Sequence, residues 1–219
     1  MGDTMQKAVV IGATGLTGGH IVRHLLALRQ PPVVVCLVRK LSTDLPTGTE
    51  QYVVDLNDTT AIAAHLDDKT WVFCAIGTTI AKAGSQEAFR KVDYDIPLAA
   101  GRAARQAGAL GMSLVSSVGA NARSFFFYNR IKGEIEEALQ AEGPPVLHIY
   151  RPGFLLGQRG QVRLGEKVAE VISFTLRPLL IGPMAKYRSI LADRLAEAMV
   201  DKARRRLGGR VVFEGNTIV

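Results

Sequence analysis

Tyr128 and Lys132 are four residues apart in the segment YNRIK, near the start of a helix predicted from about Tyr128 to Gln140. At that spacing the two side chains lie on one face of the helix. A lysine ammonium beside a phenol stabilises the phenolate, so the hydroxyl can give up and take back a proton near neutral pH. The pair therefore predicts acid–base chemistry, with Tyr128 as the transferring group.

Two serines precede this helix. Ser116 and Ser117 come directly after a strand predicted at Met112–Val115. Ligands of parallel α/β sheets bind outside the carboxyl ends of the strands. The serines are therefore expected on the same side of the sheet as the tyrosine.

A glycine-rich turn, GATGLTG, follows a strand predicted at Lys7–Ile11 and precedes a helix predicted at about Leu16–Leu28. Glycine lets the backbone turn sharply and approach a pyrophosphate, which the free N–H groups of a helix N-terminus can bind. Two threonines of the turn add hydroxyl donors. The pattern predicts a dinucleotide site, with contacts from Gly12, Thr14, Gly15, Leu16, Thr17 and Gly18.

The choice of dinucleotide is set at the end of the second strand, predicted at Val33–Val38. An NAD site places an acidic residue there, whereas this strand is followed by Arg39 and Lys40. Two cations suit a 2′-phosphate, so NADP is the expected cofactor. Asp55, followed by Leu56, comes after a short strand predicted at Gln51–Val54; its carboxylate could accept a bond from the adenine amino group or cap a helix.

The remaining pattern alternates strands with helices, which predicts a parallel sheet with right-handed crossovers. The expected fold is α/β, a doubly wound Rossmann-type sheet in a single domain over residues 1–219, with residues 154–189 as a less regular, substrate-side segment. The other predicted elements are a helix from Asp58 or Thr59 to His65 or Leu66, a strand at Thr70–Ala75, a helix at Gln86–Ala107, a strand at Val146–Tyr150, a helix at Ser189–Arg206 and a strand at Arg210–Phe213.

Composition narrows the class of protein. The net charge is +7, but the basic residues are scattered apart from KARRR at Lys202–Arg206, where cations complement a helix C-terminus. Without interleaved aromatic residues, this charge favours an anionic small molecule over nucleic acid. No apolar run approaches the roughly 18 residues of a membrane span, and the N-terminus lacks the pattern of a signal peptide. We therefore expect a cytoplasmic protein with no membrane partner.

Cysteine and histidine give no sign of a disulfide framework or a metal site. Cys36 and Cys74 each lie in an apolar, strand-like run and are expected to be buried. Among the four histidines, His20 and His24 have the i,i+4 spacing that can bind zinc, but the sequence offers no third ligand. No metal is therefore expected.

These motifs together resemble the short-chain dehydrogenase/reductase superfamily over nearly the whole chain. GATGLTG, AIG at Ala75–Gly77, VSS at Val115–Ser117, YNRIK and YRPGFLLG at Tyr150–Gly157 occur in the order typical of that superfamily. VSSVGAN, FFFYNRIKGEIEEAL and RPGFLLGQR resemble most its atypical branch, which includes the HIV Tat-interacting oxidoreductase and small bacterial relatives.

The resemblance implies a Rossmann fold, NADP and a Ser–Tyr–Lys site. Tyr128 would be the acid and base, and Lys132 would serve both the tyrosine and the nicotinamide ribose. A serine would hold the substrate oxygen, with Ser116 as first choice and Ser117 as alternative. Ala75, Ile76 and Gly77 would line the cofactor site, and Arg151, Pro152 and Gly153 would pack near the nicotinamide. A homodimer is compatible with this superfamily.

The sequence departs from the pattern of this superfamily in two places, and three functions are compatible with it. Asp93, in KVDYD, occupies the place where many members carry an asparagine, which weakens the case for an asparagine-based proton relay. The segment after Phe154 leaves room for only a modest cap, which disfavours a sugar-nucleotide epimerase or dehydratase.

The leading hypothesis is an NADP-dependent reductase of a carbonyl or conjugated small molecule, and the alternative is a non-catalytic NADP-binding redox sensor.

Overall fold

A single parallel sheet of seven strands organises the computed structural model, which describes residues 5–157, 189–205 and 207–218. The strand order is β3-β2-β1-β4-β5-β6-β9, the arrangement of a doubly wound Rossmann fold. In this order the strands are β3 (Thr49–Val53), β2 (Val33–Val38), β1 (Lys7–Ile11), β4 (Thr70–Cys74), β5 (Gly111–Val115), β6 (Leu147–Arg151) and β9 (Arg210–Glu214). The expected fold class is confirmed.

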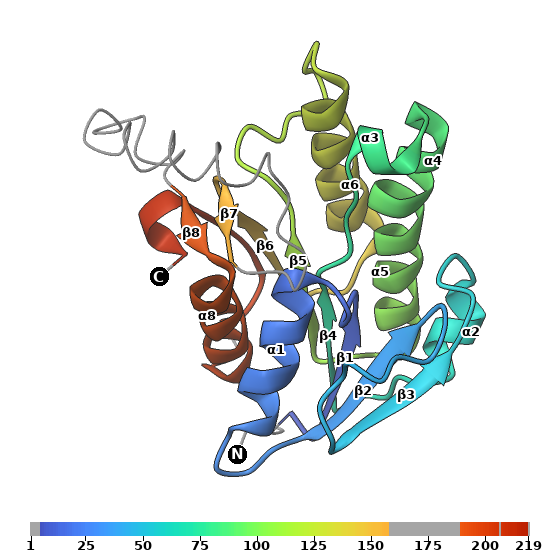
Figure 1. Cartoon of the computed structure of the whole chain (residues 1–219), viewed down its shortest axis with the longest axis vertical. Coiled ribbons are helices and arrows are strands. Elements are labelled where there is room, and N and C mark those ends of the chain that lie inside the picture. Colours follow the sequence, from blue (N-terminus) through green and yellow to red (C-terminus); the bar gives the residue numbers. More distant parts are fainter. Residues whose placement is uncertain (1–4, 158–188, 206, 219) are drawn as a thin grey trace.

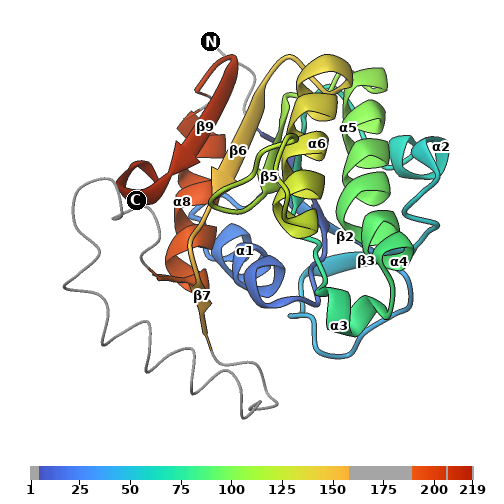
Figure 2. The ribbon, with the colours of Figure 1, turned by 90° about the horizontal axis from the view of Figure 1, so that it is seen from above.

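Helices cover both faces of the sheet, as Figures 1 and 2 show. Helices α1 (Leu16–Leu26) and α8 (Ala192–Arg205) pack on one face, and α2 (Thr59–Ala63), α5 (Ile96–Gln106) and α6 (Phe127–Glu142) on the other. Successive side chains of a strand point to opposite faces, so β1 sends Ala8 and Val10 into one core and Val9 and Ile11 into the other. This two-sided burial explains why the central strands read as apolar throughout.

The helix predicted at Gln86–Ala107 is three consecutive segments. These are α4 (Gln86–Arg90), a π-helical turn η1 (Lys91–Asp95) and α5, with the short α3 (Ile80–Ala83) before them. Pro97, in the first turn of α5, has no N–H to donate to the carbonyl of Asp93 and cannot continue a regular helix from the preceding turn. The widened turn absorbs this mismatch and carries Asp93 inward.

Most of the segment 154–189 lies outside the described residues, so its predicted role as a substrate-side cap stays a prediction. Its described residues include the short strand β7 (Leu155–Leu156), which pairs in parallel with β8 (Ile190–Leu191), directly after the segment. The last long helix begins at Ala192 rather than at Ser189 because Ile190 and Leu191 belong to this pair. Other predicted boundaries differ from the observed ones by a few residues.

The glycine turn after β1 passes directly over the end of β4. Gly12 has φ +88°, and a Cβ at this position would stand 2.7 Å from both the carbonyl carbon of Ala75 and the nitrogen of Ile76. Gly18 is equally constrained, because its Cβ would overlap the Gly12 carbonyl. The glycines therefore hold the turn, the start of α1 and the end of β4 in close contact.

Gly12→Ala should destabilise the protein more than Gly84→Ala. Both glycines have positive φ, but a Cβ at Gly84 would meet nothing within 4 Å. The backbone conformation costs an alanine about 1–2 kcal/mol at either site, and the clash at Gly12 should add about 2 kcal/mol. Urea unfolding measures both losses, and equal losses would contradict the close approach of Gly12 to β4.

Candidate functional site

A cleft of about 590 Å³ opens where β1, β2 and β4 end. Its walls are the glycine turn, the chain that follows β2 and the loop that follows β4. Nine residues expected to bind the cofactor line it: Gly12, Thr14, Gly15, Arg39, Lys40, Leu56, Ala75, Ile76 and Gly77. The sheet thus brings together residues that are more than sixty positions apart in the chain.

Eight other residues expected at the cofactor do not line the cleft, and four of them belong to α1 or to the chain after β3. Leu16, Thr17 and Gly18 form the first turn of α1, where Thr17 and Gly18 are buried. The exposed carboxylate of Asp55 accepts hydrogen bonds from the backbone and side chain of Asn57, at 2.9 and 3.2 Å. The backbone bond is the main cause of a lowered pKa of Asp55. The helix cap foreseen near this position is made by Asp58.

The cleft is basic. Arg39, Lys40 and Lys82 line it together with one acidic residue, Asp44. Lys82 belongs to the short helix α3, whose four residues gave no clear pattern in the sequence. Three cations against one carboxylate favour an anionic ligand.

The backbone of the cleft is compatible with a dinucleotide. Gly15 is the N-cap of α1 and has no side chain that could accept hydrogen bonds from the first N–H groups of the helix. Among the described residues, a Cβ on Gly15 would meet only the Gly12 carbonyl oxygen, at 3.1 Å, with open space on its other sides. This space beside free N–H groups suits the phosphates of a nicotinamide dinucleotide.

Lys132 is buried in an ion pair with Asp93. The lysine is 4% exposed and the aspartate 1%, and Nζ lies 2.8 Å from Oδ1. Burial alone would lower the pKa of Lys132, but the Asp93 carboxylate, together with Tyr128 and Cys74, raises that pKa overall. The other carboxylate oxygen accepts a hydrogen bond from the Thr78 N–H at 2.8 Å. Asp93 therefore connects the loop after β4 with helix α6.

Tyr128 lies one helical turn before Lys132, and its ring is 36% exposed. The ring contacts Phe89 of α4 with 5.8 Å between centroids, and the phenol group contributes to the raised pKa of Lys132. The predicted pairing on one helix face is present. An exposed phenol beside a buried ammonium can exchange its proton with a ligand or with water.

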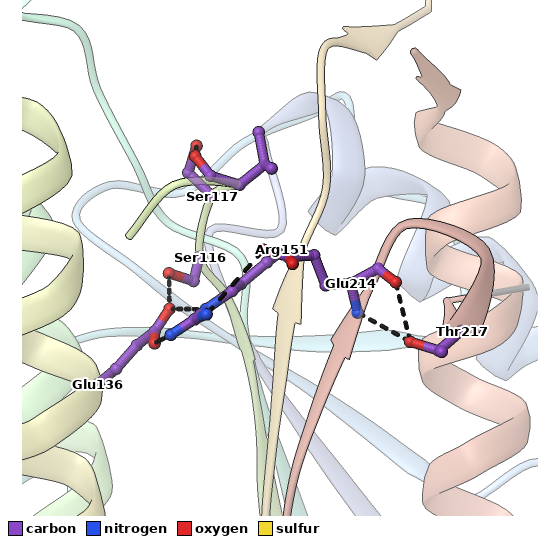
Figure 3. A network of polar contacts seen from close by, with 7 residues as sticks. Ser116, Ser117, Glu136, Arg151, Glu214 and Thr217 are labelled. Carbon is purple, nitrogen blue, oxygen red and sulfur yellow. Dashed lines mark hydrogen bonds and ion pairs between the residues drawn. The ribbon is translucent and has the colours of Figure 1, made fainter. Parts of the chain in front are cut away.

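Ser116 and Ser117 differ in their surroundings. Ser116 is 5% exposed and donates its hydroxyl hydrogen to Glu136 of α6, which also binds Arg151 (Figure 3). Ser117 is half-buried and lies away from Glu136 in Figure 3, and its hydroxyl donates to the Val118 carbonyl at 3.3 Å. A substrate oxygen could replace that long bond, so Ser117 is the better candidate than Ser116.

Glu136 is a site residue that the sequence analysis did not identify. It is 2% exposed and follows Tyr128 and Lys132 by further turns of α6. The Arg151 Nε lies 3.1 Å from both carboxylate oxygens, and the bond to Glu136 is the main cause of a raised pKa of Arg151. Arg151 also lies 3.9 Å from Glu214 of β9 (Figure 3), and neither it nor Pro152 and Gly153 lines the cleft. The sequence signal that could have identified Glu136 is its position four residues after Lys132, on the same face of α6.

The two histidines with metal-like spacing share one carboxylate. His20 and His24 of α1 lie 3.0 and 2.9 Å from the same oxygen of Asp193 in α8. Burial is the main cause of a lowered pKa of His20. These contacts join the two helices of one layer. Within the described ranges, no group of three such ligands could hold a metal ion, and no helix is long and apolar enough to cross a bilayer.

Comparison with known proteins agrees with this geometry. The family described as NAD(P)H-binding matches residues 12–171. The mitochondrial protein fmp52 of Emericella nidulans is 35% identical over 205 residues, which span 88% of this chain and 82% of the relative. The mitochondrial protein FMP52 of Candida albicans is 32% identical over 209 residues, which span 92% and 90%.

A solved structure with the same fold is that of MoeE5 in complex with UDP-glucose and NAD. It superposes with a TM-score of 0.71 at 20% identity, over 97% of this chain and 79% of that one. The likeness concerns the fold alone. The relatives correct one prediction: because these proteins are named as mitochondrial, the expected cytoplasmic location is wrong.

Glu136→Gln should destabilise the protein far more than Glu142→Gln. The first change leaves Arg151 and Ser116 beside a neutral amide in a buried network, at a cost of about 3 kcal/mol. Glu142 pairs with Arg102 where both side chains are nearly half exposed, so its loss should cost less than about 1 kcal/mol. Thermal unfolding compares them. A small loss at Glu136 would show that its network does not hold α6 to β6.

Proposed function

The chain belongs to the NAD(P)H-binding family, and on that premise we propose that it is an NADP-dependent reductase of a carbonyl compound or a conjugated small molecule. One observation carries the proposal: Tyr128 is exposed one helical turn from the buried, charged Lys132. A protein that only binds a dinucleotide needs the cleft but has no use for a phenol and an ammonium in this arrangement.

The side chains have separate tasks in this reaction. The dinucleotide supplies hydride when bound. The hydroxyl of Ser117 donates a hydrogen bond to the substrate oxygen and orients it. Tyr128 gives its proton to that oxygen as negative charge develops there. Lys132 remains charged throughout, because Asp93 compensates its burial, and its ammonium stabilises the phenolate left behind.

The preference for NADP rests on the cations of the cleft. Arg39 and Lys40 follow β2, at the place where a Rossmann fold meets the adenosine ribose, and Lys82 adds a third positive charge. A guanidinium can bind a phosphate with two parallel hydrogen bonds. These residues support the 2′-phosphorylated dinucleotide over NAD.

We also propose a branch of the superfamily and a location for this protein. VSSVGAN and FFFYNRIKGEIEEAL support the atypical, Tat-interacting oxidoreductase-like branch, and the names of the fungal relatives support a mitochondrial location. We expect the partner to be a small molecule rather than nucleic acid. A redox sensor that binds NADP without turnover is the alternative, and it predicts no role for Tyr128.

Arg39→Asp should reverse the cofactor preference. The parent protein should bind NADPH at least about tenfold more tightly than NADH, since one charge-assisted contact contributes about 1.5–3 kcal/mol. In the variant the carboxylate repels the 2′-phosphate and can accept bonds from a ribose hydroxyl. Titration by fluorescence measures both dinucleotides, with Arg123→Asp as a charge-matched control outside the cleft lining. Equal affinities in the parent would contradict the assignment of NADP.

Tyr128→Phe should reduce turnover by about two to four orders of magnitude, the usual contribution of a general acid. The change keeps the ring contact with Phe89 and removes only the hydroxyl, so NADPH binding should survive. The measurement is NADPH oxidation against a panel of aldehydes, ketones, quinones and enones.

The two serines provide the internal control for this experiment. Ser117→Ala should lower turnover without changing the unfolding temperature much, whereas Ser116→Ala should lower stability by leaving Glu136 short of one donor. An active parent that keeps its full rate as Tyr128→Phe would exclude Tyr128 as the acid. A parent that oxidises NADPH with no member of the panel would favour the sensor.

A further inference from the structure

Within the described part of the chain, Asp93 is the carboxylate that pairs with Lys132 of the proposed acid–base pair. Its Oδ1 lies 2.8 Å from the Lys132 ammonium, and its Oδ2 accepts the Thr78 N–H. A Cβ on Gly77 would stand 3.4 Å from Oδ1, so the loop that lines the cleft also closes over the carboxylate. The pair is buried and held between η1, α6 and the loop after β4.

A buried carboxylate differs from a buried amide in its charge. An amide at this position would leave the Lys132 ammonium uncompensated, with its full field acting on the Tyr128 phenol one turn away. The carboxylate cancels much of that field, and its negative charge strengthens the hold of both neighbouring groups on their protons. Because the tyrosine and the lysine interact, the pH values at which the two protons are lost are properties of the pair and cannot be assigned to either residue alone.

Among the residues that the structure describes, the other charges near this couple have partners of opposite charge. Lys132 also faces the thiol of Cys74 in β4, whose pKa burial raises to about 12. Arg90 of α4 pairs with Glu134 and lies over the ring of Tyr94. Arg130 of α6 lies 4.0 Å from the same Glu134. On the next turn of α6, Glu136 pairs with Arg151. Asp93 is thus the carboxylate in direct contact with Lys132.

We propose that Asp93 is a positioning residue that keeps Tyr128 and Lys132 both protonated, and so sets the site to give a proton to its substrate rather than to take one. The inference rests on the proposed reduction. There the carbonyl carbon receives hydride from NADPH, the carbonyl oxygen receives the Tyr128 proton, and the phenolate recovers a proton from water. Oxidation of an alcohol needs the phenolate at the start, which Asp93 disfavours.

Asp93→Asn tests the proposal through proton release in the protein without cofactor. Isotope-labelled tyrosine rings, with the Tyr128 signal assigned by comparison with Tyr128→Phe, report loss of a proton from either member of the couple. The first proton should leave about one pH unit lower in the variant, because a neighbouring negative charge has been removed. No change in this midpoint, or a change to higher pH, overturns the proposal.

Asp95→Asn is the matched control. It removes one negative charge from the same π-helical turn, but Asp95 acts on Arg90 of α4. This variant should leave the midpoint within about 0.3 pH units of the parent. An equal shift in both variants would mean that overall charge, rather than the contact with Lys132, sets the protonation, and would also overturn the proposal.

The parent alone supplies a second measurement if Asp93→Asn does not fold. Its Tyr128 ring should be a phenol at neutral pH, whereas a phenol beside an uncompensated ammonium loses its proton more readily. Phenolate already present at neutral pH overturns the proposal without any variant.

Activity separates this inference from the proposed function. In an active parent, the alkaline limb of the pH–rate profile for carbonyl reduction should move to lower pH by about one unit in Asp93→Asn. Alcohol oxidation near neutral pH should rise relative to reduction. A parent with no turnover refutes the reductase, while the ring titration still decides the role of Asp93. An active parent whose profile is unchanged in the variant refutes Asp93 alone.

Discussion

Burial of two opposite charges on one face of α6 is the constraint on which the site depends. Lys132 and Glu136 are both nearly inaccessible, and an unpaired charge in such surroundings is strongly unfavourable. Lys132 forms an ion pair with Asp93 of η1, and Glu136 forms one with Arg151 at the end of β6. Because the two partners come from different elements, satisfying both charges fixes the helix against the loop after β4 and against the sheet.

The π-helical turn that carries Asp93 follows from this arrangement and from Pro97. A regular helix through residues 86–107 would need an N–H that proline lacks, so the chain widens one turn before α5 begins. The wider turn brings Asp93 into contact with Lys132 and with the Thr78 N–H. A local defect of backbone hydrogen bonding thereby supplies the buried counter-ion of the site.

The sequence was sufficient for features that depend on near neighbours in the chain. The glycine turn, the strands at Lys7–Ile11 and Val33–Val38, and the shared face of Tyr128 and Lys132 follow from spacing alone. Features that depend on distant partners did not follow. Ser116 and Ser117 are chemically identical, and they differ in burial and in the contact that Ser116 makes with Glu136 of another element. Lys82 reaches the cleft from a helix too short to show a period. The location of the protein in the cell does not follow from any packing pattern, and the expected cytoplasmic location was corrected by the names of the relatives.

Exposure along α6 decreases from Tyr128, which is 36% exposed, to Lys132 and Glu136, which are 4% and 2% exposed. A proton donor must reach both substrate and solvent to be used again, whereas the charges that tune it act most strongly where water is excluded. One helix meets both needs because residues four apart share a face while the helix descends towards the core. The order of these three side chains therefore lets the phenol exchange protons at the surface while the ion pairs beneath it stay intact.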